Sequence, residues 1–315
     1  MILDVDRISI TLLMDNYTDR LLTSSRVAKR PPMVGNEEIL PAPLAEHGFS
    51  ALVEIQHGES RWRFLFDTGV SKMGMLANAD LLGVSLDVEA IILSHGHFDH
   101  ITGLASTLGR IGSPTRVIVH PDAFQRRWLF LPDGTRAMMP HMDEEELKRQ
   151  GAAIEKTSGV TALPSNDSPS LLVTGEIPRK TPYEIGFPLQ QAETKEGLVH
   201  DPLVRDDQAL VANLKGKGLV VISGCGHAGI INTLHYAMEL SGTDKIHAVV
   251  GGFHLTGTTY EAAIEPTLKA MGDLDPRYIV PCHCTGWKAV NRIIQLFPEK
   301  FIQPSVGTTL DFYTD

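Results

Sequence analysis

Three histidines and one aspartate lie within one stretch, Leu93-Ser94-His95-Gly96-His97-Phe98-Asp99-His100. Residues 88–93 are mostly apolar, which predicts a short buried strand that ends where this cluster begins. Neutral imidazole and carboxylate groups are the ligands that dications such as zinc accept. The same groups, buried without a metal, would compete for few polar partners, which costs free energy. The alternative is a histidine-rich turn at the surface, and the density of ligand-type side chains favours a metal site.

Four further polar motifs lie at the ends of predicted strands. They are Phe66-Asp67-Thr68-Gly69, Ser223-Gly224-Cys225-Gly226-His227-Ala228-Gly229, Gly251-Gly252-Phe253-His254-Leu255 and Pro281-Cys282-His283-Cys284-Thr285-Gly286. Strands that alternate with helices predict layered α/β packing, and such folds bind ligands in the loops at one edge of the sheet. We therefore expect one rim to carry His95, His97, Asp99, His100, His227, His254 and His283.

Together these motifs resemble those of the metallo-β-lactamase superfamily. The pattern H-x-H-x-D-H after a strand resembles the superfamily signature. The later motifs resemble the branch of the archaeal 7,8-dihydropterin-6-methyl-4-(β-D-ribofuranosyl)-aminobenzene-5'-phosphate synthases, from about residue 10 to the C-terminus. The resemblance implies an α/β fold, an αββα sandwich of two mixed sheets with helices on the outer faces. It does not specify a substrate, because one fold carries many functions.

The resemblance also implies two divalent metal ions, about 3.5–4 Å apart in such sites. The expected ligands are His95, His97 and His227 for the first ion and Asp99, His100 and His283 for the second. We expect zinc, with manganese or iron as alternatives.

The chain departs from the superfamily pattern at Gly224-Cys225, where a bridging aspartate is usual. Three residues could replace this aspartate as a metal ligand: Cys225, His227 or Asp207. A thiolate is a good metal ligand, but Cys225 could also be a small buried residue that only packs. Strand alternation predicts that Cys282 and Cys284 point away from His283 and pack elsewhere.

Three residues are expected to support the site or contact the substrate. In the resembled superfamily the aspartate at Asp67 orients the metal loop, and a plain turn is the alternative. His254 is expected to act as a general acid, as in phosphodiesterase branches, with a capping histidine as the alternative. Arg179 could pair with a substrate phosphate or carboxylate, or form a surface salt bridge with Glu176 or Glu184.

These features predict a metal-dependent hydrolase that cleaves a phosphoester or related ester in a small molecule. The metals would lower the pKa of a water toward ~7 to supply hydroxide. Asp99 and His254 would be the catalytic residues, with His254 protonating the leaving group. Two alternatives stay open: a C–N condensation of the dihydropterin–ribofuranosyl-aminobenzene phosphate synthase type, and a metal-dependent binding module.

The bulk composition limits the partners and the location. The 315 residues are 43% hydrophobic with a net charge of −10 and no dense run of Lys or Arg, so a nucleic-acid partner is not expected. No apolar stretch is long enough to span a membrane, and the acidic N-terminus does not resemble a secretory signal. Three cysteines, all inside the motifs, indicate a reducing cytoplasm. The oligomeric state stays open, and a homo-oligomer is one possibility.

One domain, residues 1–315, is expected, because the motifs are spread along the chain. Its irregular, proline-interrupted segment at about 151–206 is expected to form a wall of the substrate pocket. Strands are expected at 7–14, 49–55, 61–66, 88–93, 116–120, 206–214, 219–222, 246–250 and 278–280. Helices are expected at 78–82, 102–108, 122–129, 143–150, 229–240, 260–271 and 286–296.

Overall fold

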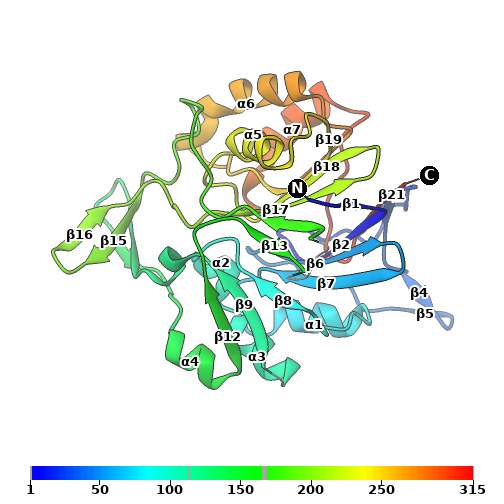
Figure 1. The fold of residues 1–315 in the computed structure, drawn as a ribbon, viewed down its shortest axis with the longest axis horizontal. Helices are drawn as coiled ribbons and strands as arrows, with labels where there is room; N and C mark the ends of the chain where they lie inside the picture. The colour runs from blue at the N-terminus through cyan, green and yellow to red at the C-terminus, as the bar shows by residue number, and fades with distance from the viewer. Residues whose placement is uncertain (1, 113, 165–168, 315) are drawn as a thin grey trace.

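Two large sheets pack face to face, and helices cover both outer faces (Figure 1). The computed structural model describes residues 2–112, 114–164 and 169–314, so residues 165–168 of the expected pocket segment lie outside it. Apolar side chains from both sheets form one shared inner core, with Ile10, Phe64, Val220 and Val250 fully buried. This arrangement confirms the αββα sandwich.

The first large sheet has eight strands among the described residues. In spatial order they are β12 (Ala152–Lys156), β9 (Thr115–Val119), β8 (Ala90–Ile92), β7 (Ser60–Phe66), β6 (Ser50–His57), β2 (Arg7–Met14), β21 (Thr309–Tyr313) and β3 (Ala28–Lys29). The strands β7, β8, β9 and β12 run parallel, and the other neighbours are antiparallel. Seven of the eight residues of β2 are buried, which explains why its sequence becomes continuously apolar.

The second large sheet has seven strands in the part of the chain that is described. They are β13 (Thr161–Leu163), β14 (Leu171–Val173), β17 (Ala209–Leu214), β18 (Gly218–Ser223), β19 (Ile246–Gly252) and β20 (Tyr278–Cys282), with β1 (Asp4–Val5) paired to β17. The strands β18, β19 and β20 are parallel, so their carboxyl ends meet at one edge of the sheet.

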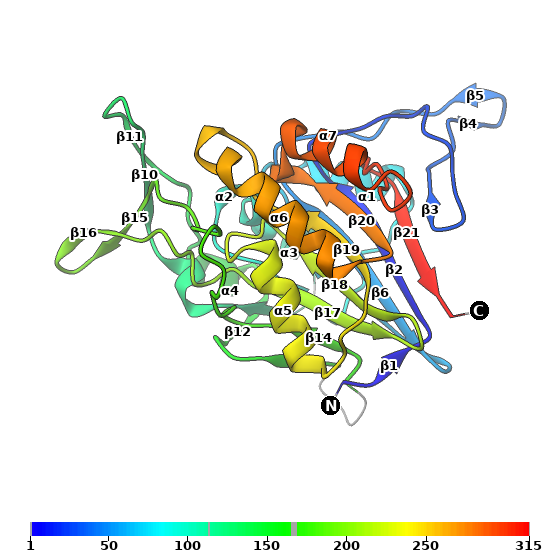
Figure 2. The same cartoon turned by 90° about the horizontal axis from the view of Figure 1, so that it is seen from above.

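The helices lie in two layers outside the sheets (Figures 1 and 2). The layer on the second sheet consists of α5 (Ile230–Ser241), α6 (Glu261–Leu274) and α7 (Trp287–Leu296). The layer on the first sheet includes α1 (Gly74–Leu81), α2 (Phe98–Ile101), α3 (Leu104–Ile111) and α4 (Glu144–Arg149). Single turns of 3₁₀ helix occur at η1 (Pro121–Phe124), η2 (Thr258–Tyr260) and η3 (His283–Thr285).

A smaller four-stranded sheet projects from the body of the molecule (Figures 1 and 2). It contains β11 (Arg136–Met138), β10 (Arg127–Phe130), β15 (Gln190–Thr194) and β16 (Gly197–His200), and a separate hairpin joins β4 (Val34–Gly35) to β5 (Glu38–Ile39). The expected helix at 122–129 is therefore wrong after its first turn. The segment Arg127–Phe130 pairs with β15 instead, because a distant strand partner outweighs local helix propensity.

The segment at about 151–206 is more regular than its prolines indicated. It contributes β12, β13 and β14 to the large sheets and β15 and β16 to the projecting sheet. The C-terminal strand β21 was also missed, although it pairs with β2 along five residues.

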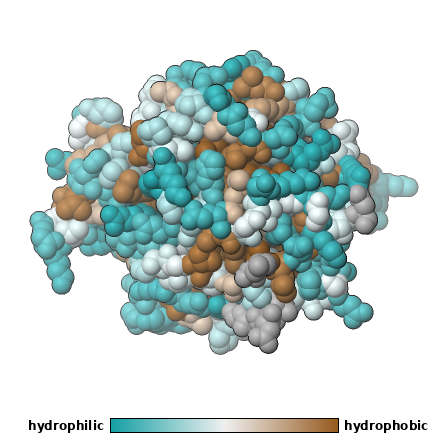
Figure 3. Space-filling view, turned by 45° about the horizontal axis from the view of Figure 1, so that its top comes forward, coloured by the Kyte–Doolittle hydropathy of each residue, from teal (hydrophilic) through white to brown (hydrophobic). Residues whose placement is uncertain are grey.

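The surface is largely hydrophilic on the face shown in Figure 3, with hydrophobic residues gathered in separate patches. Within the described ranges, no helix combines the length and the apolarity that crossing a membrane requires.

Candidate metal centre

Four strand ends, those of β8, β18, β19 and β20, carry the histidines and meet in one place. Ring centroids lie 4.8 Å apart for His95 and His227, 4.0 Å for His227 and His254, and 4.9 Å for His100 and His283. Parallel strands bring these residues together although up to 188 positions separate them in the sequence (95 to 283). The structure thus places the expected rim residues in one cluster.

The first ligand group is His95, His97 and His227, whose candidate ligand atoms all lie within 4.8 Å of one another. Burial and the neighbouring histidines lower the pKa of His95 and of His227 well below the ordinary value. Burial also lowers the pKa of His97, to about 4. Among the described residues, no hydrogen-bond partner reaches Nε2 of His95 or either ring nitrogen of His227. Buried neutral imidazoles with free lone pairs are a fit for a divalent cation and an unfavourable arrangement without one.

The second ligand group is His47, Asp99 and His283. Oδ2 of Asp99 lies 3.3 Å from Nε2 of His283 and 3.5 Å from Nε2 of His47. His100 adjoins this group, because its Nε2 lies 3.2 Å from Nε2 of His283. Sequence reasoning missed His47, which stands in an irregular loop and belongs to no motif.

Charge distinguishes the second group from the first. Burial would raise the pKa of Asp99, but His100 and His283 outweigh burial and hold that pKa well below its usual range. Burial lowers the pKa of His100, yet Asp67 and Asp99 overcome it and raise the pKa to about 9. The carboxylates therefore make this side of the centre more attractive to a cation.

Asp67 lies where a carboxylate that orients His100 would lie. Its Oδ2 is 2.6 Å from Nδ1 of His100, and its two oxygens accept hydrogen bonds from the backbone N–H and the hydroxyl of Ser94 at 2.7 Å each. The bond to Nδ1 leaves Nε2 of His100 directed at His283. Such a carboxylate sets the tautomer and the direction of a ligating histidine.

The projecting sheet contributes a residue that belongs to no sequence motif. Gln190, at the start of β15, is fully buried, and its Oε1 lies 2.5 Å from Nε2 of His97. Its Nε2 donates to the backbone oxygen and to Oδ2 of Asp201. Beside it, the buried guanidinium of Arg127 pairs with Asp206 through two hydrogen bonds. Thus the 151–206 segment lies against the first ligand group.

Arg179 contacts this centre through the backbone. It donates a hydrogen bond of 2.7 Å from Nη1 to the carbonyl of His227. Within the described part of the chain, Arg179 forms no ion pair with Glu176 or Glu184 at contact distance. Burial lowers the pKa of Arg179, and the charges of Asp207, Glu184 and Glu176 oppose this lowering. Glu184 accepts hydrogen bonds from the backbone N–H groups of Ile231 and Asn232, in the first turn of α5.

Asp207 is buried beside the His227 loop. Its Oδ2 accepts a hydrogen bond of 2.6 Å from the backbone N–H of Ala228, and burial raises the pKa of Asp207 to about 7. It belongs to none of the ligand groups that the described residues form. The geometry therefore does not favour Asp207 as the replacement for the bridging aspartate.

Two of the three cysteines lie inside the cluster. Sγ of Cys225 lies 3.0 Å from Sγ of Cys284, and Cys284 forms a candidate ligand group with Cys225 and His283. The expectation that Cys284 points away from His283 is wrong, because η3 begins at His283 and ends the strand alternation there. Cys282 does point away, into the core between the sheets.

His254 lies against the first ligand group, with its ring centroid 4.0 Å from that of His227. It is half-buried, its Nδ1 lies 3.3 Å from Sγ of Cys225, and no described residue makes a hydrogen bond to its Nε2. The ring of Phe187 lies 5.6–5.7 Å from the rings of His97, His227 and His254. One apolar ring therefore covers three histidines of the centre.

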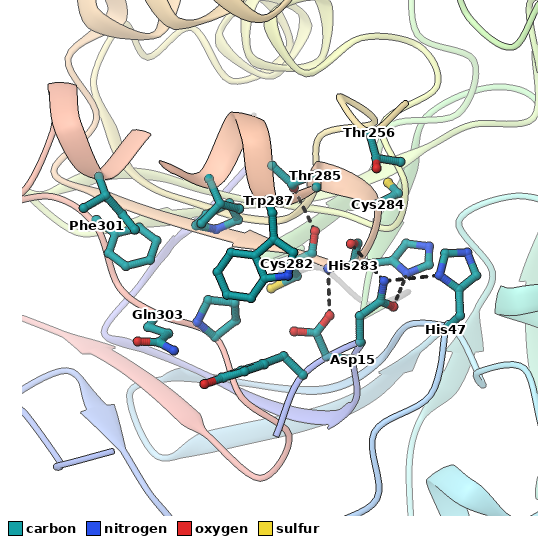
Figure 4. A pocket seen from close by; sticks show the side chains of 17 residues that line it. Asp15, His47, Thr256, Cys282, His283, Cys284, Thr285, Trp287, Phe301 and Gln303 are labelled. Atoms are coloured by element: carbon teal, nitrogen blue, oxygen red, sulfur yellow. Dashed lines mark hydrogen bonds between the residues drawn. The ribbon is translucent and has the colours of Figure 1, made fainter. Parts of the chain in front are cut away.

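A cavity of about 340 Å³ opens beside the second ligand group. Figure 4 shows His47 and His283 at one end of it and Phe301 and Gln303 at the other. The rings of Tyr17 and Trp287 meet edge to face across the lining, with centroids 6.1 Å apart. The cavity has the size of a site for a small molecule.

Comparisons with known proteins find similarity along most of the chain. The model of the family described as Metallo-beta-lactamase superfamily matches residues 48–283. A protein of Methanocaldococcus jannaschii named 7,8-dihydropterin-6-methyl-4-(beta-D-ribofuranosyl)-aminobenzene-5'-phosphate synthase is 32% identical over 274 residues, 85% of this chain and 90% of that protein. An uncharacterized protein of the same organism is 33% identical over 266 residues, 84% of this chain and 92% of that protein. The crystal structure of Tm1679, described as a metal-dependent hydrolase of the beta-lactamase superfamily, is 27% identical with a TM-score of 0.73, covering 98% of this chain and all of that one.

Proposed function

The chain belongs to the metallo-β-lactamase superfamily, and on this premise we propose that it is a metal-dependent hydrolase. Its centre would hold two divalent ions, with zinc the first choice, and would cleave a phosphoester or related ester in a small molecule.

One observation carries this proposal: two groups of ligand-type side chains lie side by side at one rim. The first group would hold one ion through His95, His97 and His227. The second would hold another through His47, Asp99 and His283, with His100 beside them. The unpartnered nitrogens of the first group support a cation as their partner. Bound divalent ions supply activated water and stabilise negative charge on a reacting oxygen.

His254 is proposed to donate the proton to the leaving group. Its Nε2 is buried and has no hydrogen-bond partner among the described residues, so this nitrogen would be paired by a substrate group that enters the site. Phe187 would keep bulk water from the histidines beneath it, which strengthens electrostatic interactions at the site. The segment at about 151–206 would in this way form a wall over His97, His227 and His254, whereas other segments line the cavity beside His283. The chain would form a single 1–315 domain.

The cavity beside His283 supports a small substrate. Its volume of about 340 Å³ suits a molecule with one or two rings better than a polymer, and the net charge of −10 disfavours a polynucleotide. A cytoplasmic location and the absence of nucleic-acid and membrane partners stay part of the proposal.

The variant His97→Ala tests the reaction. It should abolish hydrolysis of bis(p-nitrophenyl) phosphate and of p-nitrophenyl esters while circular dichroism shows a folded protein. The variant His235→Ala, which changes an exposed histidine of α5, is the matched control. Elemental mass spectrometry should find about two metals per chain in the control and fewer in His97→Ala. Hydrolysis that persists in His97→Ala would contradict the assignment.

A second candidate reaction is favoured by the 32% identical relative, which is named a synthase. The same centre would then assist a condensation that yields the dihydropterin–ribofuranosyl-aminobenzene phosphate product in that name. Detection of the coupled product by mass spectrometry, with purified protein and no detectable ester hydrolysis, would favour the synthase. Neither activity, with metal still bound, would favour a metal-dependent binding module.

A further inference from the structure

A small cavity adjoins the first ligand group on the side of α6. Its volume is about 20 Å³, and its lining includes His227, His254, Tyr260 and the segment 183–186. A cavity of this size holds one water-sized group and has no room for a ring. It therefore offers a place for a single oxygen atom beside a histidine of the metal centre.

Two buried polar atoms in the residues that line this cavity have no partner. They are Nε2 of His254 and the hydroxyl oxygen of Tyr260, and neither makes a hydrogen bond with a described residue. The two rings lie edge to face, with centroids 4.5 Å apart. A buried hydroxyl without a partner costs free energy, and a polar group that enters the cavity would remove this cost. Burial raises the pKa of Tyr260, so its hydroxyl keeps its proton and can serve as a donor.

The backbone between β19 and α6 brings the two side chains together. His254 has a φ of +48°, a left-handed conformation that is uncommon for residues other than glycine. Hydrogen bonds hold this loop, because the backbone N–H groups of Phe253 and Thr256 both donate to η3. The turn η2 then reverses the chain, so that the ring of Tyr260 meets that of His254. A residue that its surroundings hold in a strained conformation is typical of a functional site.

We propose that Tyr260 is a further catalytic residue, whose hydroxyl donates a hydrogen bond to the leaving-group oxygen that His254 protonates. The inference rests on the hydrolysis given under the proposed function. When the bond from this oxygen to phosphorus or to the acyl carbon breaks, the electron pair of the bond stays on the oxygen. The proton moves to the oxygen from Nε2 of His254. Tyr260 keeps its own proton and stabilises the negative charge that develops on the oxygen.

The variant Tyr260→Phe tests this role, because it removes only the hydroxyl. In the zinc-loaded full-length protein, kcat for bis(p-nitrophenyl) phosphate should fall ~10- to 100-fold, the effect of one hydrogen bond to a charged group. The loss should be larger when phenol replaces p-nitrophenol as the leaving group, since a poorer leaving group depends more on stabilisation of its oxygen. The matched control is Tyr278→Phe, which removes a hydroxyl at the end of β20 opposite His283 and should keep wild-type activity.

Three further measurements separate a catalytic hydroxyl from a structural one. Inorganic phosphate can place an oxygen in the cavity, so isothermal titration calorimetry should show its Kd for the zinc-loaded protein rising ~10- to 100-fold in Tyr260→Phe. The Tm of the metal-free variant should equal or exceed that of the wild type, because the hydroxyl that is lost has no partner among the described residues. Combining His254→Gln with Tyr260→Phe should cost less activity than the product of the two single losses, since both groups act on one oxygen.

Unchanged kcat and unchanged phosphate affinity in a folded Tyr260→Phe protein would overturn the proposal. A lower Tm with both quantities unchanged would also overturn it and would assign the hydroxyl a structural role. If the wild type binds phosphate but hydrolyses no ester, the proposed reaction fails, and weaker phosphate binding in Tyr260→Phe still supports the hydroxyl as a donor to a bound oxyanion. Hydrolysis that Tyr260→Phe leaves intact refutes this inference alone.

Discussion

Gln190 offers a sharp test of how the projecting sheet acts on the centre. Its Oε1 lies 2.5 Å from Nε2 of His97, and its amide nitrogen is held by two hydrogen bonds to Asp201, at 2.8 and 3.0 Å. The amide nitrogen therefore faces Asp201, and the oxygen accepts from His97. This places the proton of His97 on Nε2 and leaves Nδ1 free for a metal. Gln190 is thus a positioning residue.

The variant Gln190→Ala should weaken metal binding at the first ligand group. Loss of such an outer partner costs ~10- to 100-fold in metal affinity, which corresponds to about 1.4–2.8 kcal/mol. The buried Nε2 of His97 would also lose its partner, so the free energy of unfolding of the metal-free protein should fall by ~1–3 kcal/mol.

Competition with a chromophoric chelator measures the dissociation constants of the two ions separately. We expect one constant to rise in Gln190→Ala and the other to stay at its wild-type value. Gln191→Ala is the matched control, because adjacent residues of β15 face opposite sides and Gln191 is only half-buried. Two unchanged dissociation constants in a folded Gln190→Ala protein would refute the reasoning.

Three further substitutions test other parts of the structure. Arg127→Met leaves Asp206 buried without its cation, so denaturant unfolding should show a loss of ~3–5 kcal/mol, and an unchanged stability would contradict the buried pair. Asp67→Asn keeps the shape but removes the carboxylate beside Nδ1 of His100, so chelator competition should show one ion bound ~10- to 100-fold more weakly, and equal affinities would refute this role. Burial raises the pKa of Asp207 to about 7. The folded protein therefore binds this proton more tightly than the unfolded chain does. The resulting gain in the free energy of unfolding is complete below about pH 4 and is lost as the pH rises through about 7. In the metal-free wild type this loss of stability amounts to up to ~4 kcal/mol, and Asp207→Asn should not show it. The Tm of the variant should therefore fall less than that of the wild type between about pH 4 and about pH 8.5. An identical fall in both proteins would contradict the raised pKa of Asp207.

The sequence by itself determined the fold class and most of the candidate centre. Ligand-type side chains directly after apolar strands are a local signal, because strand periodicity and turn chemistry involve only neighbouring residues. The parallel arrangement of β18, β19 and β20 then brings His227, His254 and His283 to the rim where β8 delivers His95. The location of these four histidines at one rim follows from the order of strands and helices along the chain.

Only the tertiary structure decided which other residues surround the centre. His47 reaches Asp99 from an irregular loop, and Gln190 reaches His97 from 93 positions away, through a strand of the projecting sheet. Likewise Arg127 lies in a strand, not in the expected helix, because β15 pairs with it. Such contacts depend on how distant segments pair and on how much free energy the burial of each polar group costs. Neither the pairing of distant strands nor the burial of a side chain is determined by the neighbouring residues alone. No local sequence pattern could therefore have indicated these contacts.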